Sequence, residues 1–293
     1  MSRRIAGLLL ATAALALVVT GFAGASSSTS LGLKKVPKIA KMVPAKIRHK
    51  GTLKVASDAT YAPMEFIAKD GKTVIGVDAD LAKALGTVMG LKLNVVNATF
   101  STIIPGIQSG KYDIGMSSFT DTKARQKVVD FVTYFSAGTS FYVKAQGGPA
   151  IKNLGSLCGK TVSVETGTTE QADATAQSKK CKNAGKPGVK VDAFNDQGAA
   201  NLAVSSGRAQ VGMADSPVAA YIVKQSHGLF KLSGNSYGTA PYGIALPKHN
   251  GMTKPMLAAV KYLMKQGTYK KILKKWGVQK GAISNPKING AIS

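Results

Sequence analysis

A ten-residue phrase occurs twice in this chain, and it limits the folds open to the chain more than any other feature. SGKYDIGMSS, residues 109–118, returns 97 positions later as SGRAQVGMAD, residues 206–215, with Ser, Gly, Gly and Met unchanged. In both copies a predicted helix ends at Ser-Gly, where glycine suits the left-handed turn that closes a helix, and a predicted strand then runs into polar residues. The repeat predicts two related α/β units, although a common helix-to-strand connection without functional meaning would look the same.

The hydrophobic periodicity around both copies alternates between that of strands and that of helices. TLKVAS (52–57) and KLNVVN (92–97) alternate as strands, and an apolar helix face follows the N-cap candidate Asp78 between them. The second half has strands at 160–166, 189–194 and 209–215, separated by helices at 169–180, 196–207 and 217–226. Such alternation implies parallel sheets whose ligands bind beyond the carboxyl ends of the strands, so residues 117–120 and 214–215 should face a shared cleft.

Both ends of the chain differ from the part between them. Residues 1–25 have a short basic start, an apolar run and small residues in an A-x-A pattern, which is typical of a secretory signal peptide that is cleaved. Residues 26–50 contain seven Lys/Arg and no acid, which predicts a basic flexible tether. Residues 281–293 are expected to form a loose C-terminal tail. The part between them is long enough for one large domain or two lobes.

The formal net charge of +25 raises the question of an anionic partner. The lysines are spread along the chain, aromatic residues are sparse and no nucleic-acid motif is present, so no nucleic acid is expected as a partner. The remaining interpretations are a solvated basic surface or, through the basic tether, contact with an anionic cell envelope.

The two cysteines, Cys158 and Cys181, predict a disulfide bond because the chain is expected to be exported. In the chain-entropy model such a bond would stabilise the fold by about 3 kcal/mol. The three histidines, His49, His227 and His249, are isolated from one another, so no metal site is expected. No cofactor is expected either.

Six segments of the chain carry recognisable motifs in a fixed order. They are SDATYAPMEF (57–66), DGKTVIGVDADLAKAL (70–85), FSTIIPGIQSGKYDIGMSSFTDTKARQKVVDF (100–131), GKTVSVETGTTEQ (159–171), SGRAQVGMADSP (206–217) and GTYKKILKKWG (267–277). Together, from about residue 51 to 278, they resemble the extracytoplasmic solute-binding proteins for polar amino acids that serve ATP-driven (ABC) importers, solute-binding protein family 3.

The resemblance implies the α/β fold of the type II periplasmic binding proteins, with parallel-rich sheets. In that fold a ligand cleft lies between two lobes that are joined by two crossover strands, here near 141–144 and 237–241. Lobe 1 would comprise residues 51–142 and 239–280, and lobe 2 residues 143–238. Each copy of the repeated phrase would then bring one strand of its lobe to the cleft.

The resemblance also implies which residues hold the backbone groups of an amino acid. Arg125 would bind the α-carboxylate through its planar fork, and Ser118 and Thr120 would hold the carboxylate or the amino group. Thr169 would present its backbone N–H to the carboxylate at a helix start, and Asp215 would pair with the α-ammonium. From the residues alone, Asp215 would equally serve as the N-cap of the helix that follows it.

The side-chain pocket is expected to consist of Asp58, Tyr61, Phe100 and Glu165. Tyr61 and Phe100 would pack on the ligand, or would belong to the core. The two acids favour a ligand with a positive charge or several donors, such as arginine, lysine, ornithine or glutamine, unless Glu165 points to solvent.

The sequence therefore predicts a secreted, monomeric binding protein, not an enzyme. It would capture a polar amino acid by hinge closure, with Arg125, Ser118 and Thr120 on one lobe and Asp215 and Thr169 on the other, and deliver it to an ABC permease. The alternative is an enzyme of the cyclohexadienyl or arogenate dehydratase type on the same fold, with Glu165 as general acid. A wall-associated sensory or structural protein is a third interpretation.

Overall fold

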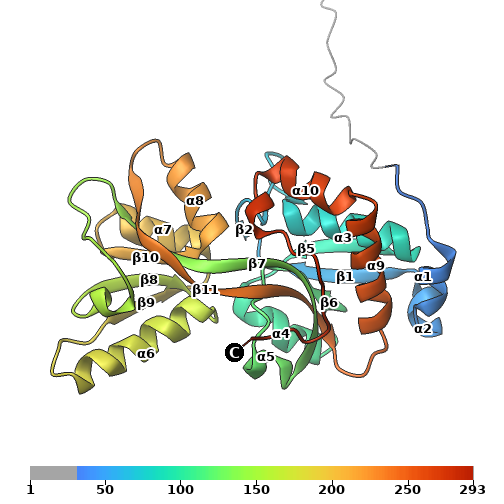
Figure 1. Cartoon of the computed structure of the whole chain (residues 1–293), viewed down its shortest axis with the longest axis horizontal. Helices are drawn as coiled ribbons and strands as arrows, with labels where there is room; N and C mark the ends of the chain where they lie inside the picture. The colour runs from blue at the N-terminus through green and yellow to red at the C-terminus, as the bar shows by residue number, and fades with distance from the viewer. Residues whose placement is uncertain (1–31, 293) are drawn as a thin grey trace, which may run out of the picture. The chain divides into compact units, whose positions relative to one another are not determined.

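The computed structural model describes residues 32–292, so the predicted signal peptide lies outside the described residues. An eight-stranded sheet runs through this part in the order β5-β1-β6-β11-β7-β10-β8-β9 (Figure 1). Its strands are β1 Thr52–Ser57, β5 Lys92–Asn97, β6 Ile114–Gly115, β7 Val129–Lys144, β8 Thr161–Glu165, β9 Lys190–Phe194, β10 Val211–Asp215 and β11 Phe230–Pro247. A second, three-stranded sheet consists of β2 Thr60–Tyr61, β3 Glu65–Ile67 and β4 Val74–Ile75.

The two longest strands, β7 and β11, pair with each other in antiparallel fashion and join two halves of the molecule. On one side of this pair, β1 is parallel to both β5 and β6, and on the other side β8 is parallel to both β9 and β10. We call the first half, which also holds β2–β4, lobe 1, and the half with β8–β10 lobe 2. The predicted parallel-rich α/β architecture with two connecting strands is therefore present.

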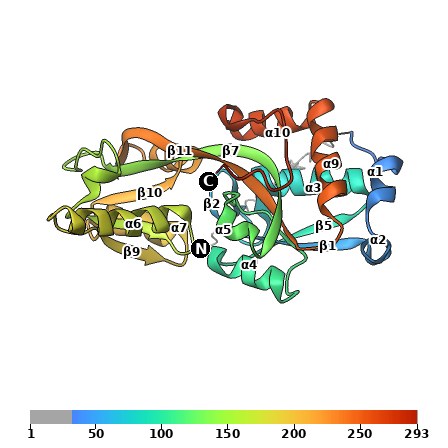
Figure 2. The same ribbon diagram turned by 60° about the horizontal axis from the view of Figure 1, so that its bottom comes forward.

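Helices cover the sheet in both lobes (Figures 1 and 2). Lobe 1 has α3 Val77–Met89, α4 Phe100–Gln108, α5 Lys123–Gln126, α9 Thr253–Lys265 and α10 Thr268–Trp276, and the short 3-10 turn η2 Gln279–Gly281 follows α10. Lobe 2 has the 3-10 turn η1 Leu154–Leu157 and the helices α6 Thr169–Asn183, α7 Gln197–Ser205 and α8 Ser216–Gln225. Among the helices of residues 32–292, none is long and apolar enough to cross a membrane.

The repeated phrase forms the same local structure in each lobe. α4 ends before Gly110, whose φ is +76°, and α7 ends before Gly207, whose φ is +82°. Both glycines adopt the left-handed conformation that terminates a helix, and a strand, β6 or β10, follows within a few residues. The two copies therefore deliver Ser117 and Asp215 to the carboxyl ends of equivalent strands.

The boundaries predicted between the lobes fall inside β7 and β11. Both strands continue through these positions, but their pairing shifts register between Ser233 and Tyr237 and again between Tyr237 and Ala240. The register shifts lie near the predicted crossover at 237–241. The exact division of the chain into 51–142, 143–238 and 239–280 stays a prediction.

The expected flexible tether is wrong for residues 37–50, while residues 26–31 lie outside the described part. Two short helices, α1 Pro37–Met42 and α2 Ala45–Lys50, occupy this segment. In the ribbon view α1 lies against α3 and α9 (Figure 2). Ile39 and Val43 are buried, and the N–H of Val36 donates to the carbonyl of Val88 at 3.0 Å. Burial of these few apolar side chains fixes helices that are too short to be stable alone.

The expected loose tail is wrong as well, because residues 287–289 pair with the edge of β7. The N–H of Thr133 donates to the carbonyl of Lys287 at 2.9 Å, and the N–H of Asn289 donates to the carbonyl of Phe131 at 3.0 Å. The tail therefore covers backbone groups of a strand edge that would otherwise be open to pairing with other chains.

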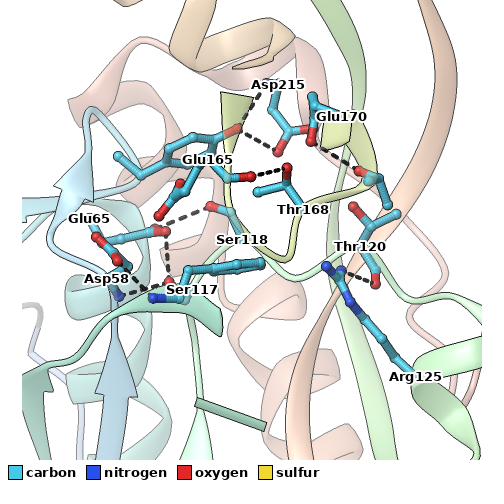
Figure 3. A pocket seen from close by; sticks show the side chains of 13 residues that line it. Asp58, Glu65, Ser117, Ser118, Thr120, Arg125, Glu165, Thr168, Glu170 and Asp215 are labelled. Carbon is cyan, nitrogen blue, oxygen red and sulfur yellow. Dashed lines mark hydrogen bonds between the residues drawn. The ribbon is translucent and has the colours of Figure 1, made fainter. Parts of the chain in front are cut away.

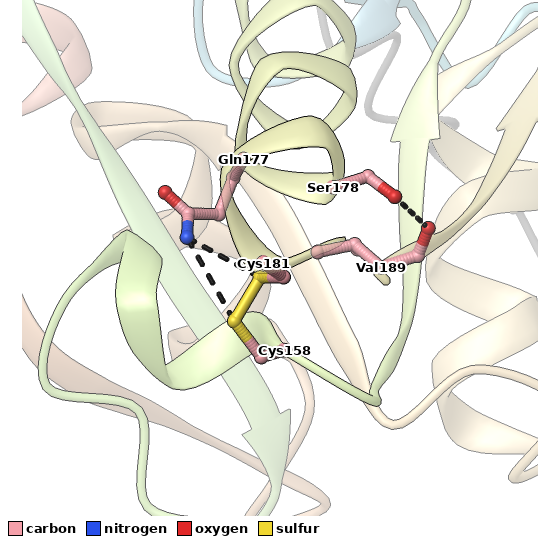
Figure 4. The surroundings of a disulfide bond; sticks show 5 residues. All are labelled: Cys158, Gln177, Ser178, Cys181 and Val189. Atoms are coloured by element: carbon pink, nitrogen blue, oxygen red, sulfur yellow. Dashed lines mark hydrogen bonds between the residues drawn. A yellow bond between two sulfur atoms is a disulfide. The ribbon is translucent and has the colours of Figure 1, made fainter. Parts of the chain in front are cut away.

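The predicted disulfide bond between Cys158 and Cys181 is present (Figure 4). It ties the end of η1 to the last turns of α6, and the side-chain amide of Gln177 lies against both sulfurs. The bond therefore anchors the helix whose first turn reaches the pocket described below.

A wide groove with an empty volume of about 1670 Å³ is lined by both lobes. Its walls include Ala220 of α8, Gly138 of β7 and Trp276 at the end of α10. Trp276 is the single tryptophan of the chain. Its ring packs edge-on against Phe66 with 5.5 Å between centroids, and its Nε1 donates to Oδ2 of Asp80 at 2.8 Å.

Candidate ligand-binding site

One pocket, with an empty volume of about 280 Å³, is lined by every residue that the sequence predicted for ligand binding (Figure 3). Lobe 1 contributes Asp58, Tyr61, Glu65, Phe100, Ser117, Ser118, Thr120 and Arg125, and lobe 2 contributes Glu165, Thr168, Thr169, Glu170 and Asp215. The residues meet because four strands end here: β1 before Asp58, β6 before Ser117, β8 at Glu165 and β10 at Asp215. Their role in binding remains a prediction that the geometry below supports.

Arg125 lies at one end of the pocket with its guanidinium held in a fixed orientation. Nη1 donates to the carbonyl of Thr120 at 2.9 Å, and Nη2 donates across the lobes to the carbonyl of Gly167 at 3.0 Å. The guanidinium carbon lies 5.4 Å from the ring centre of Phe100 and 5.5 Å from that of Phe119. Burial lowers the pKa of Arg125, but a guanidinium stays protonated at any physiological pH. Arg125 is therefore a preorganised cation for a carboxylate.

Ser118 occupies a left-handed backbone conformation, with φ of +49°, that is uncommon for a residue other than glycine. Two buried acids hold it there: its N–H donates to Asp78 at 3.0 Å, and its hydroxyl donates to Glu65 at 3.1 Å. Asp78 is thus not the N-cap that the sequence suggested. Gly76 precedes α3, and the carboxylate of Asp78 lies inside the protein, where it also accepts the hydroxyl of Tyr134 at 2.7 Å.

Glu65 and Asp78 share the space beneath Ser118, and both are completely buried. Burial and the neighbouring Asp78 raise the pKa of Glu65 well above its usual range. Burial also raises the pKa of Asp78 to about 6, although Ser118, Tyr134 and Glu65 hydrogen-bond to it. The pair therefore holds a proton at neutral pH, because two buried carboxylates in contact do not both ionise.

Asp215 lies at the lobe 2 side of the pocket and bonds directly to lobe 1. The hydroxyl of Tyr61 donates to Oδ2 of Asp215 at 3.0 Å and accepts the N–H of Asp215 at 2.9 Å. Asp215 precedes α8, but its side chain makes no capping hydrogen bond. Its carboxylate is therefore free of a capping role and available to a ligand cation. Burial, followed by the nearby Glu170, raises the pKa of Asp215 well above its usual range.

The first turn of α6 lines the pocket through Thr168, Thr169 and Glu170. The helix begins at Thr169, and the side chain of Thr168 caps it by accepting the N–H of Gln171 at 3.2 Å. Glu170, in the same turn, is buried and accepts the hydroxyl of Thr139 from β7 at 2.7 Å. The helix start therefore offers an anion site beside a carboxylate that is fixed to a connecting strand.

Asp58 and Glu165 approach each other from opposite lobes, and both are buried, so Glu165 does not point to solvent. Asp58 accepts three donors: the N–H of Phe100 at 2.8 Å, the hydroxyl of Thr60 at 2.6 Å and the N–H of Thr60 at 3.1 Å. Burial raises the pKa of both acids, and for Glu165 the Asp58 carboxylate adds to the effect.

The pocket concentrates acidic residues in a strongly basic protein. Of the chain's 14 acidic residues, five line the pocket and a sixth, Asp78, lies directly behind them. Among the described residues that line it, Arg125 is the only cation. A site of this kind suits a ligand with one carboxylate and more than one positive charge.

Four lining residues were missed by the sequence analysis: Glu65, Ser117, Thr168 and Glu170. Ser117 and Thr168 lie next to predicted residues, and Glu170 follows Thr169, so adjacency to a motif residue was the available signal. Glu65 lies within the motif segment 57–66, but its place beneath Ser118 depends on the β2–β4 sheet, which no sequence pattern indicated.

The chain matches the model of the bacterial extracellular solute-binding proteins, family 3, over residues 53–279. It belongs to this family. The arginine-binding protein ArgT of Corynebacterium glutamicum is 34% identical to this solute-binding protein over 255 residues, 87% of this chain and 83% of that protein. The lysine/arginine/ornithine-binding periplasmic protein of Escherichia coli is 32% identical over 236 residues, 77% of this chain and 87% of that protein.

Solved structures similar to this family 3 protein include amino-acid-binding proteins. An ancestral arginine-binding protein bound to glutamine has a TM-score of 0.72 and 36% identity, and the match covers 78% of this chain and 98% of that chain. An ancestral amino-acid-binding protein described as a precursor of cyclohexadienyl dehydratase has a TM-score of 0.68 and 36% identity, with 79% and 97% covered. These matches confirm the predicted family and fold, and they do not favour the dehydratase over the binding function.

Proposed function

We propose that this protein captures a cationic amino acid, arginine in the first place, outside the cytoplasm and delivers it to an ABC import permease. One observation carries the proposal: the pocket holds an oriented guanidinium, Arg125, at one end and paired acids from both lobes elsewhere. The named relatives that bind arginine, lysine or ornithine support the same ligand class.

The geometry suggests how such a ligand lies. Its α-carboxylate would accept from Arg125 and from the N-terminus of α6 at Thr169, and its α-ammonium would donate to Asp215. Its side-chain cation would then reach Asp58 and Glu165 at the other end. Charge-assisted hydrogen bonds at both ends would select length as well as charge.

Closure of the lobes is part of the proposal, because the binding groups are divided between them. In the present structure the lobes are already bonded by Tyr61 with Asp215 and by Arg125 with Gly167. A zwitterion satisfies Arg125 and Asp215 together only in the closed form, so the ligand shifts the open and closed populations toward closure. The permease would recognise the closed form.

The cellular setting completes the proposal. The protein would be secreted through the predicted signal peptide, act as a monomer without catalysis, and contact the anionic envelope through its basic residues. Exposed side chains of Lys38, Lys41 and Lys46 in the N-terminal helices support that contact.

The central test is a thermal-shift screen of ligand-free protein against the amino acids, prephenate and arogenate, followed by calorimetry. Arginine, lysine or ornithine should raise the melting temperature by mass action. Arg125→Ala should weaken arginine binding at least about 100-fold, since one partner of a buried charge pair is removed. Lys123→Ala, two residues away and on the same short helix, should bind normally. Stabilisation by the cyclic acids alone would instead favour the dehydratase.

A further inference from the structure

The two acids at the far end of the pocket differ in their hydrogen-bond donors. Asp58 accepts three donors from Thr60 and Phe100, whereas Oε1 of Glu165 is buried and has no partner among the described residues. The two carboxyl groups line the same pocket from opposite lobes, and burial beside Asp58 raises the pKa of Glu165. One proton between them satisfies both groups, and it belongs on Glu165, which has no other donor, while Asp58 remains ionised.

The charges around Glu165 favour the same arrangement. On lobe 2, Glu170 of α6 and Asp196 before α7 face it, and on lobe 1 the facing groups are Asp58 and the phenol of Tyr61. Arg125, the pocket's cation, lies beside the stacked rings of Phe100 and Phe119, where its guanidinium bonds to two carbonyls. An ionised Glu165 would therefore sit among like charges without a counterion.

We infer that a cationic ligand side chain takes the place of this proton, so that binding of arginine releases it. The inference rests on the proposed function. The guanidinium N–H groups donate to Asp58 and Glu165, the O–H bond of Glu165 breaks, and the proton passes to the solvent buffer. The net charge at this end of the pocket is unchanged, because one positive charge leaves as another enters.

The exchange makes Glu165 the residue that distinguishes charged from neutral ligands. A neutral isostere such as citrulline brings no charge and leaves the proton in place. The ratio of the affinity for arginine to the affinity for citrulline should therefore rise with pH. While the empty site holds its proton, the rise should reach about tenfold per pH unit. The pKa of Glu165, raised by burial and by Asp58, places this window above its ordinary range.

The test is isothermal titration calorimetry with arginine and citrulline, at one pH, in buffers with different enthalpies of ionisation. The dependence of the measured heat on the buffer gives the number of protons released. Arginine should release about one proton more than citrulline. Protons displaced at the α-ammonium end, where Asp215 lies, appear with both ligands and cancel in the difference.

Glu165→Gln should remove that difference and flatten the pH dependence of arginine affinity. Asp192→Asn, which changes a surface acid on β9 outside the pocket, should keep both. Equal proton release for arginine and citrulline in the unmodified protein would overturn the inference, whether or not the Gln variant folds. A difference that persists in Glu165→Gln would overturn it as well. If no cationic amino acid produced a binding heat, the proposed function itself would fail.

Discussion

Two buried acids, Glu65 and Asp78, set the backbone conformation of Ser118 in the wall of the pocket. They hold Ser118 in a left-handed conformation through its N–H and its hydroxyl. Because each accepts a donor that would otherwise be buried without a partner, removing either should disturb the loop by about 1–3 kcal/mol. Asp78 thus acts on the ligand only through the residues above it, whereas Glu65 also lines the pocket.

The same pair should make the stability of the ligand-free protein depend on pH. Folding raises the pKa of both acids, so protonation of the pair stabilises the folded state. This stabilisation is complete below the ordinary pKa values near 4. It is lost as the pH rises, through about 6 for Asp78 and through a higher pH for Glu65. Glu65→Gln keeps a donor to Asp78 but cannot ionise. Between pH 5 and 8 the variant should therefore lose less stability than the unmodified protein, by at least about 1 kcal/mol.

Chemical denaturation at several pH values checks this expectation. Asp70→Asn is a useful control, because hydrogen bonds from Thr73 and Lys72 lower the pKa of that exposed acid to about 2. Its substitution should therefore change the pH dependence of stability only at acid pH, and not between pH 5 and 8. Parallel stability curves for Glu65→Gln and the unmodified protein above pH 5 would contradict the assignment of a shared proton.

At the level of single residues, sequence motifs predicted the pocket well where a residue follows a strand end. Asp215 was expected there because it ends a strand, whereas Asp58 and Glu165, which also lie at strand ends, were expected there from the family resemblance. Asp78 was misassigned because an acid at a helix start normally caps it, and only the tertiary fold shows that this one turns inward. The protonation of a buried acid is likewise invisible in sequence, since it depends on neighbours from distant segments.

Among the elements, α6 connects the pocket to the disulfide bond between Cys158 and Cys181. Its first turn supplies Thr168, Thr169 and Glu170 to the site, and its last turns are held by the disulfide bond. Glu170 also bonds to Thr139 of β7, so the position of this helix is coupled to a strand that joins the lobes.

Removal of the disulfide bond should therefore lower the stability of lobe 2. The bond links residues 23 positions apart, a separation for which the chain-entropy model gives about 3 kcal/mol. Calorimetric melting of a Cys158→Ala/Cys181→Ala variant, and of the unmodified protein with and without reductant, should show lower transitions in both cases. Free thiols in protein recovered from the medium, or unchanged melting after reduction, would contradict a stabilising role.

The elements that the sequence predicted correctly have a clear period and flanking turn residues, as in β1, β5 and α7. The elements that it missed depend on contacts with distant segments. α1 and α2 have six residues each, and their apolar positions have meaning only against α3 and α9. The C-terminal segment has no period of its own and is ordered by the edge of β7.

For the whole molecule, the central consequence is that one sheet serves both lobes. β7 and β11 contribute residues to the apolar clusters of both lobes, and their pairing shifts register on both sides of Tyr237 and again between Tyr242 and Gly243. Bending of the pair at these shifts would change the distance between the lobes. The internal repeat explains why both lobes contribute to the site, because each lobe brings the same kind of strand end to the cleft.

The groove that contains Trp276 gives the protein an optical signal of its own. One wall belongs to α8 of lobe 2 and another to the end of α10 in lobe 1, so any change in the angle between lobes changes what surrounds the indole. Since the chain has a single tryptophan, fluorescence excited selectively at tryptophan comes from this one position. Ligand capture should therefore change the wavelength and intensity of the intrinsic tryptophan fluorescence, which can be followed in real time without attaching a dye.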